Sequence, residues 1–218
     1  IVAMLPFQNG QVAAAWAGCE ENVGINGDDS ATLFDTGYTV ASDDERRGFK
    51  GFRKIAIANS ATADLSTFTD ASLLALLAKM GDRASNLKEV FLIPSVLAFL
   101  KYIVGSSTFA TWEKVGQLMT PANMSGTVGI CYGMPVAPSG KLAANLHTDG
   151  LYTGSVGYTA ILAVHANSYL IGERRGFTSR VVEDIETDQL KQVTSCREVM
   201  IKRAGSTEVS EVYGYKIS

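Results

Sequence analysis

The stretch that decides the fold is EVFLIPSV, residues 89–96. Its apolar run at 89–93 predicts a short strand that ends at Pro94. A helix over 96–104 should follow, because proline suits a first helical turn, where its missing N–H would have no partner anyway. A strand that leads through proline into a helix predicts a layered domain, in which the helix packs back on the sheet.

Two helices are expected on the N-terminal side of this stretch. Residues 8–23 repeat apolar side chains at helical spacing. A second helix begins where Thr69 or Asp70 can cap the first free amides, and it ends where Gly81 can adopt a left-handed conformation. Its apolar stripe is Leu73, Leu74, Leu77 and Met80. Between the two helices, residues 52–58 alternate weakly, which favours a strand.

The C-terminal side reads mainly as strands. Residues 129–138 predict a strand interrupted by glycine and proline, and residues 158–170 predict one or two more. Residues 190–202 form a long strand candidate, and residues 209–217 alternate as a last strand. In the long strand, one face would carry Val193, Ser195, Arg197, Val199 and Ile201, and the other Thr194, Cys196, Glu198 and Met200. Helices and strands together predict an α+β fold.

Composition excludes several classes of protein. The chain has 218 residues and a formal net charge of -3, so it offers no basic surface for tight nucleic-acid binding. This charge is compatible with a container for DNA, whose wall should not grip the packaged polymer. The three cysteines are far apart and give no disulfide framework or zinc spacing. No apolar run reaches the roughly 18 residues that a membrane-spanning helix needs.

Catalytic chemistry is not visible in the sequence. His147 and His165 lie in different segments without a partner pattern, and we interpret both as structural or exposed residues. Gly140-Lys141 resembles part of a phosphate loop, but Pro135 stands where the first glycine is required and Leu142 replaces the magnesium-binding hydroxyl. We therefore predict no enzyme, no metal and no cofactor. A pocket that joins either histidine to a carboxylate and a nucleophile would favour an unrecognised small enzyme instead.

Four stretches, taken in order, carry a family resemblance. They are residues 13–28 with Asn-Gly-Asp at 26–28, residues 49–82, residues 90–136 with Gly-Met-Pro-Val at 133–136, and residues 169–199 with Ile-Gly-Glu-Arg-Arg at 171–175. This order resembles the major capsid proteins of tailed bacteriophages, whose fold is shared by encapsulins. Ile93 departs from the pattern, because the family often has Asn-Pro at this step.

The resemblance implies a domain organisation. A peripheral domain, residues 1–72 and 158–205, would hold the end of the family's spine helix and long β-strands. An axial domain, residues 73–157 and 206–218, would hold a mixed sheet flanked by helices. The family's N-terminal arm, extended loop and first part of the spine helix would all precede Ile1.

The function implied is that of a structural subunit of the icosahedral shell that encloses double-stranded DNA in a tailed bacteriophage or prophage. Such a chain assembles in the bacterial cytoplasm into pentamers and hexamers of the virion capsid. Scaffold, portal or decoration proteins are possible partners, DNA is enclosed without sequence-specific binding, and no membrane is involved. An encapsulin-like shell of a cellular nanocompartment is the alternative.

Two charged clusters are the candidate contacts between subunits. They are Glu45, Arg46 and Arg47, and Glu173, Arg174 and Arg175. An arginine fork can meet a carboxylate of a neighbour in such a contact. The competing interpretation is a solvated loop, since exposed ion pairs contribute only about 0–1 kcal/mol each.

Overall fold

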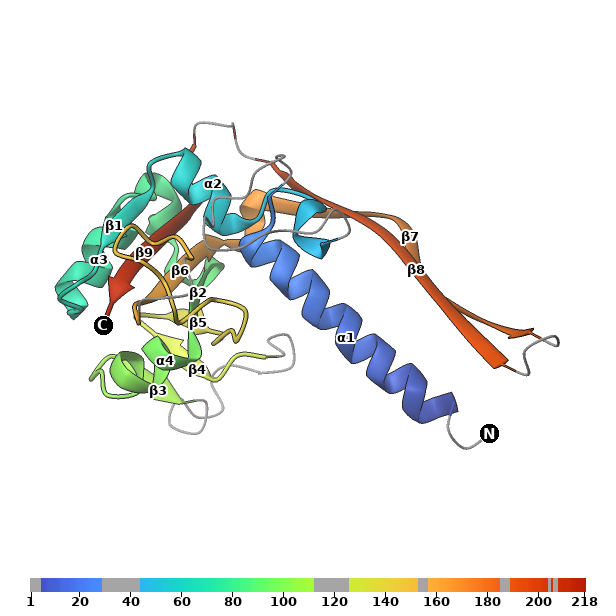
Figure 1. Cartoon of the computed structure of the whole chain (residues 1–218). Helices are drawn as coiled ribbons and strands as arrows, with labels where there is room; N and C mark the ends of the chain where they lie inside the picture. The colour runs from blue at the N-terminus through green and yellow to red at the C-terminus, as the bar shows by residue number, and fades with distance from the viewer. Residues whose placement is uncertain are drawn as a thin grey trace.

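The computed structural model describes residues 5–28, 44–111, 126–152, 157–184, 189–203, 205 and 208–218. Figure 1 shows a body of sheet and short helices, from which a long helix and a long two-stranded hairpin project on the same side. The helix is α1 (Leu5–Asn26), and the hairpin pairs β7 (Tyr169–Asp184) with β8 (Gln189–Lys202). None of the described helices is long and apolar enough to cross a bilayer.

The body is built on a seven-stranded mixed sheet with the order β1-β9-β6-β2-β5-β4-β3. The pairs β1–β9 and β2–β5 are parallel, and the other pairs are antiparallel. β6 is buried along its whole length between β9 and β2. The strands are β1 (Thr62–Asp64), β2 (Val90–Pro94), β3 (Phe109–Thr111), β4 (Gly129–Cys131), β5 (Met134–Val136), β6 (Thr159–His165) and β9 (Glu211–Ile217).

This sheet draws on both predicted domains. β1 comes from the range 1–72 and β6 from the range 158–205, which the sequence assigned to the peripheral domain. Both strands nevertheless pair with β9, which the sequence assigned to the axial domain. The apolar run of β6 explains why, since a strand buried on both faces belongs inside a sheet.

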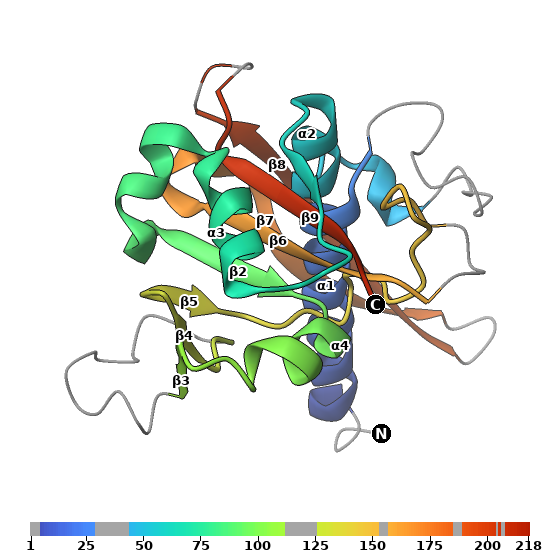
Figure 2. The same cartoon turned by 90° about the vertical axis from the view of Figure 1, so that its left-hand side faces the viewer.

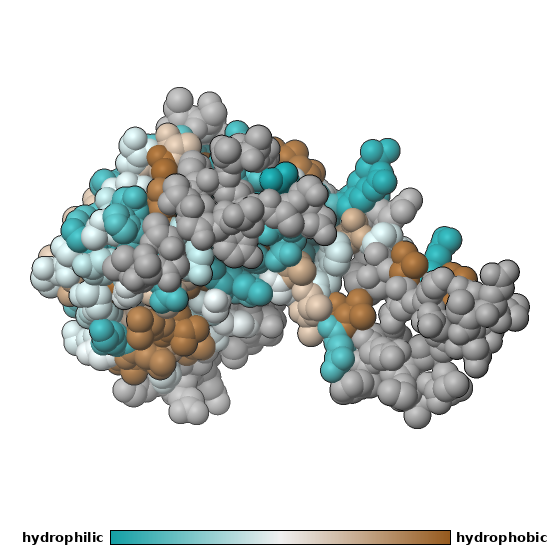
Figure 3. All heavy atoms as spheres, viewed as in Figure 1, coloured by the Kyte–Doolittle hydropathy of each residue, from teal (hydrophilic) through white to brown (hydrophobic). Residues whose placement is uncertain are grey.

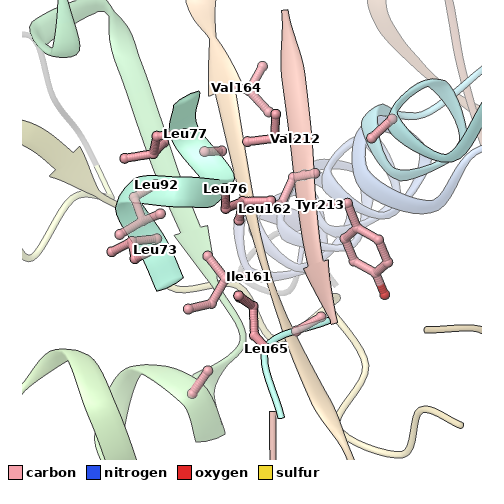
Figure 4. Packing of buried hydrophobic residues seen from close by; sticks show 14 of the residues in the cluster. Leu65, Leu73, Leu76, Leu77, Leu92, Ile161, Leu162, Val164, Val212 and Tyr213 are labelled. Carbon is pink, nitrogen blue, oxygen red and sulfur yellow. The ribbon is translucent and has the colours of Figure 1, made fainter. Parts of the chain in front are cut away.

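Helix α3 (Asp70–Ala78) forms as predicted, and it covers one face of the sheet. Thr69 caps it through a capping box with Ser72, and Gly81 has a φ of 56° beyond its end. Leu73, Leu76 and Leu77 point into the core (Figure 4). The predicted stripe was wrong at Leu74, which is 43% exposed, because Leu76 takes the inner position instead.

The strand-to-helix step at residues 89–96 is confirmed. β2 ends at Pro94, and Ser95 caps α4 (Val96–Ala98) by accepting a 3.1 Å hydrogen bond from the Ala98 amide. The expected helix continues as a π-helical turn, η4 (Phe99–Ile103). The predicted strand at 129–138 is instead the hairpin β4–β5, because Tyr132 and Gly133 both adopt positive φ and make a two-residue turn.

The strand expected at residues 52–58 is wrong, because Phe52–Ala58 forms helix α2. Arg53 and Ala56, three residues apart, are its buried residues, which is a helical spacing. Weak alternation over seven residues was too little to distinguish the two-residue period of a strand from the 3.6-residue period of a helix. The remaining helices in the described part of the chain are the short 3₁₀ turns η1 (Glu45–Arg47), η2 (Gly81–Ser85), η3 (Leu87–Glu89) and η7 (Ala166–Ser168).

Candidate assembly surfaces

The first charged cluster lies in η1, against the C-terminal end of α1. The Asn22 side chain of α1 donates a 2.8 Å hydrogen bond to Glu45. Arg46 turns back on its own chain: its Nε and terminal nitrogen donate to the two oxygens of Asp44, at 2.9 and 2.8 Å. Hydrogen bonds from the Arg46 side chain and then its backbone amide hold the pKa of Asp44 below its usual range. Part of this cluster therefore stabilises the chain itself, and its contact with a neighbour stays a prediction.

Replacing Arg46 by glutamine should therefore destabilise the isolated chain, by about 1 kcal/mol at neutral pH. The sign with pH follows from the lowered pKa of Asp44. The paired carboxylate contributes stability above its unfolded pKa of about 3.9, and that contribution is lost as pH falls through the folded value. Urea unfolding at several pH values should show the difference between variant and wild type shrinking below about pH 4. An equal difference at acid and neutral pH would contradict this assignment, and the exposed Lys88→Gln is the control.

The second charged cluster lies in β7, near the base of the hairpin. Glu173 and Arg174 are exposed, and the strand register shifts on both sides of Arg175. Glu173 stands directly opposite Glu198 of β8, a pairing of like charges that is unfavourable on its own. A neighbouring cation would relieve it.

A third carboxylate reaches the same place from α1. Burial, and then the neighbouring Glu198, raise the pKa of Glu20 despite a hydrogen bond from Trp16. Cys196 donates a 3.1 Å hydrogen bond to Glu198, and burial together with this carboxylate raises the pKa of Cys196 to about 11. Ligand atoms of Glu20, Cys196 and Glu198 lie within 4.8 Å of one another. Exposed acidic groups often gather without an ion, so we assign no metal to them.

The two faces predicted for the long strand are confirmed at the base of the hairpin. Cys196, Glu198 and Met200 are partly buried on the side of α1. Val199 and Ile201 on the opposite face are exposed, together with Leu170 of β7, which is paired with Ile201. This apolar outer face has no covering element among the described residues.

A second exposed apolar surface lies on the body, along α4 and η4. Val96, Leu100 and Val104 are all exposed there. On an α-helix with 3.6 residues per turn, side chains spaced four residues apart shift gradually around the helix axis. The π-helical turn has more residues per turn and offsets this shift, so the three side chains stay in line. Figure 3 shows an apolar patch in the region of the body where Figure 1 places α4. Patches of this kind mark interaction sites more often than chance exposure does.

The hairpin is anchored to the body by a buried carboxylate. Glu211 at the start of β9 is 0% exposed. It accepts hydrogen bonds from the Tyr169 hydroxyl, from Lys202 at 3.0 Å and from Asn59 at 3.1 Å. Burial and the Glu211 carboxylate raise the pKa of Tyr169. Because Tyr169 begins β7 and Lys202 ends β8, both strands of the hairpin are tied to the sheet at one point.

Among the described residues, the enzyme alternative has one candidate cluster, at His165. The ring Nδ1 lies 2.8 Å from the Ser168 hydroxyl, and Nε2 lies 3.2 Å from Glu89. His165 and Glu89 line a cleft of about 800 Å³. Ser168, however, is 1% exposed, so its oxygen cannot meet a substrate in that cleft. The cluster joins the end of β6 to η3 and supplies no nucleophile. His147 lies in an exposed turn beside Asp149, where no dry site exists for catalysis.

The chain thus has a body of mixed sheet, a projecting helix and a projecting hairpin. No protein-family model matches the sequence, and none of the curated proteins matches it. Among solved structures, a chain of the satellite phage P4 procapsid that includes the size determination protein is similar, with a TM-score of 0.52 and 11% identity. The alignment covers 98% of this chain and 67% of that one.

A second similar structure is the capsid of an empty GTA particle, with a TM-score of 0.56 and 13% identity. The alignment covers 99% of this chain and 67% of that one. Likeness over nearly the whole chain shows that this protein has the fold of tailed-phage capsid proteins. The predicted fold class is confirmed. At 11% and 13% sequence identity, the likeness to these two structures establishes the fold only.

Proposed function

We propose that the protein is the structural subunit of an icosahedral capsid that encloses double-stranded DNA in a tailed bacteriophage or prophage. The observation that carries the proposal is the likeness to two phage-type capsids over nearly the whole chain, including the regions that project from the body. The exposed apolar surfaces on α4 and on the hairpin supply faces that a shell would cover. Nothing in the described ranges favours an encapsulin-like compartment over this proposal.

In this proposal the body acts as the axial domain and the projecting elements as the peripheral domain. The whole seven-stranded sheet, β1 and β6 included, belongs to the body, because strands of one hydrogen-bonded sheet move together. α1 and the β7–β8 hairpin form the peripheral part. Copies would gather into pentamers and hexamers around the axial domains, and assembly would take place in the bacterial cytoplasm.

The charged clusters are proposed contacts of different kinds. Glu173 and Arg174 are exposed on the projecting hairpin, where a neighbour can reach them. Glu45, Arg46 and Arg47 lie at the junction of α1 with the body. Because Arg46 is held by Asp44, the Glu45–Arg47 cluster would contact a neighbour mainly through the surface that it shapes.

The test is expression from the complete coding sequence, followed by gradient sedimentation and electron microscopy. We expect closed particles of uniform size, and we expect a map of their wall to accept the body, α1 and the hairpin as one repeating unit. The 218-residue chain alone is expected to associate only weakly and to form no closed particles. A soluble monomer from the complete coding sequence, under every assembly condition tried, would reject the proposal.

A further inference from the structure

A hollow of about 660 Å³ lies where α1, the hairpin and the sheet meet. Its apolar walls include Ile25 from α1, Ile93 from β2, and Ile171 with Met200 from the hairpin. Phe52 of α2 also lines it. Side chains of the described chain do not fill this space, so an apolar group from another molecule could be buried in it. We call it the groove.

The rim of the groove is acidic. Glu20, Glu21 and Glu198 all line it. Glu21 is already bound by the Ser139 hydroxyl at 2.6 Å. Glu20 and Glu198 approach each other from α1 and β8, and the electrostatic cost of ionising Glu20 beside Glu198 helps to raise the pKa of Glu20. A cationic side chain placed between them would remove that cost, so the groove fits an occupant that is apolar and positively charged.

The outer half of the hairpin presents that combination. Arg180 of β7 is paired with Val193 of β8, so the two share a face, and Val182 lies two residues further along the same strand. Arg180 is exposed, and the exposed fractions of Val182 and Val193 are 54% and 60%. We call this surface the outer hairpin face.

A chain cannot place this face in its own groove. Arg180 lies nine residues along an extended strand from Ile171, which lines the groove, and this separation is roughly 30 Å at the rise of a β-strand. Figure 1 shows that the hairpin runs away from the body. The complementary groove and face must therefore belong to different molecules.

We propose that the groove of one copy receives the outer hairpin face of a second copy, with Arg180 between Glu20 and Glu198 and the valines against the apolar walls. The inference rests on the proposed function, which is the reason to choose a second copy as the occupant. The contact is head-to-tail, because the two surfaces differ, and such contacts propagate around rings or along walls instead of closing in a pair.

Two variants of the 218-residue chain separate the halves of the contact. The groove variant combines Glu20→Gln with Glu198→Gln, and the hairpin variant carries Arg180→Glu. Sedimentation velocity over a concentration series should show the wild type self-associating, and each variant alone doing so about tenfold more weakly or worse. An equimolar mixture should form a 1:1 complex that grows no further, because only one intact groove and one intact face meet there.

The control is Lys88→Glu, an exposed cation on the body, which should associate like the wild type. A wild type that stays monomeric throughout the series would overturn the inference, as would variants that associate normally, a mixture that stays monomeric, or a control that loses association too. These failures leave the proposed function standing if the complete coding sequence still yields particles. If no particles form while the mixture gives its 1:1 complex, the proposed function fails and the contact stands.

Discussion

Replacing Glu211 by glutamine should lower the free energy of unfolding by about 3 kcal/mol, a large share of the roughly 5–15 kcal/mol that holds a domain together. The carboxylate is 0% exposed and accepts three hydrogen bonds, from Tyr169, Lys202 and Asn59. An amide nitrogen at that place would face donors, and the mostly buried ammonium of Lys202 would lose its counter-charge. Urea unfolding followed by circular dichroism measures the loss.

The matched control is Asp64→Asn, which neutralises a partly exposed carboxylate paired with Lys216 at 2.7 Å. We expect it to cost no more than about 1 kcal/mol. A double-mutant cycle of Glu211→Gln with Lys202→Met should be strongly non-additive, because removing both charges avoids an unpaired one. Glu211 would not be the anchor of the hairpin if Glu211→Gln and Asp64→Asn lowered the free energy of unfolding equally. Additive losses in the double-mutant cycle would lead to the same conclusion.

This anchor could not have been read from the sequence. Glu211 is one charged residue at the start of an apolar strand, and its partners lie nine, 42 and 152 residues away. The only signal was its position among buried neighbours in residues 209–217. Local patterns predict local structure, and they do not show which distant donors will meet a carboxylate in the folded chain.

The elements that were predicted correctly are those with strong local signals. The capped helix at Asp70–Ala78 has Thr69 before it and Gly81 after it, and the long strand at Gln189–Lys202 alternates over many residues. Phe52–Ala58 was predicted as a strand because the segment is too short to show a clear helical period. Its N-cap is Gly51, which has no side chain to cap the helix, so the sequence carries no capping signal there either. The decisive contacts of α2 are tertiary.

The candidate contact residues were located by charge density, which is a surface property. Charge density cannot tell a residue that is paired within the chain from one that is free to pair outside it. Arg46 illustrates this limit, because the Asp44 that occupies its guanidinium is only two residues away. The groove was missed for a related reason. Its walls come from residues as far apart in the sequence as Ala17 and Met200, and no short motif joins them.

Replacing Gly51 by alanine should lower the free energy of unfolding by about 3 kcal/mol, near the upper end of what an overpacked site costs. Gly51 precedes α2, and its ordinary φ of -80° means that backbone conformation is not the obstacle. The obstacle is space, since an added Cβ would meet the Gly27 amide nitrogen and lie 2.8 Å from the Ile25 carbonyl oxygen. Backbone atoms cannot turn aside as a side-chain end can. The junction would have to open, and the hydrogen bond from the Gly51 amide to the Gly27 carbonyl, 2.8 Å long, would be strained.

Gly24→Ala in α1 is the matched control, because the nearest atom to its added Cβ is 4.0 Å away, on Phe52. Alanine favours a helix over glycine by about 0.5–1 kcal/mol, so this variant should unfold at higher urea than the wild type. The two substitutions add the same methyl group at the same junction and should shift stability in opposite directions. If both variants shift the urea midpoint the same way, close backbone approach is not what fixes the angle at which α1 leaves the body. In the proposed assembly that angle would set where the groove of each copy faces its neighbour. Gly51→Ala in the complete coding sequence should therefore also prevent particles of uniform size from forming, while Gly24→Ala should leave them intact.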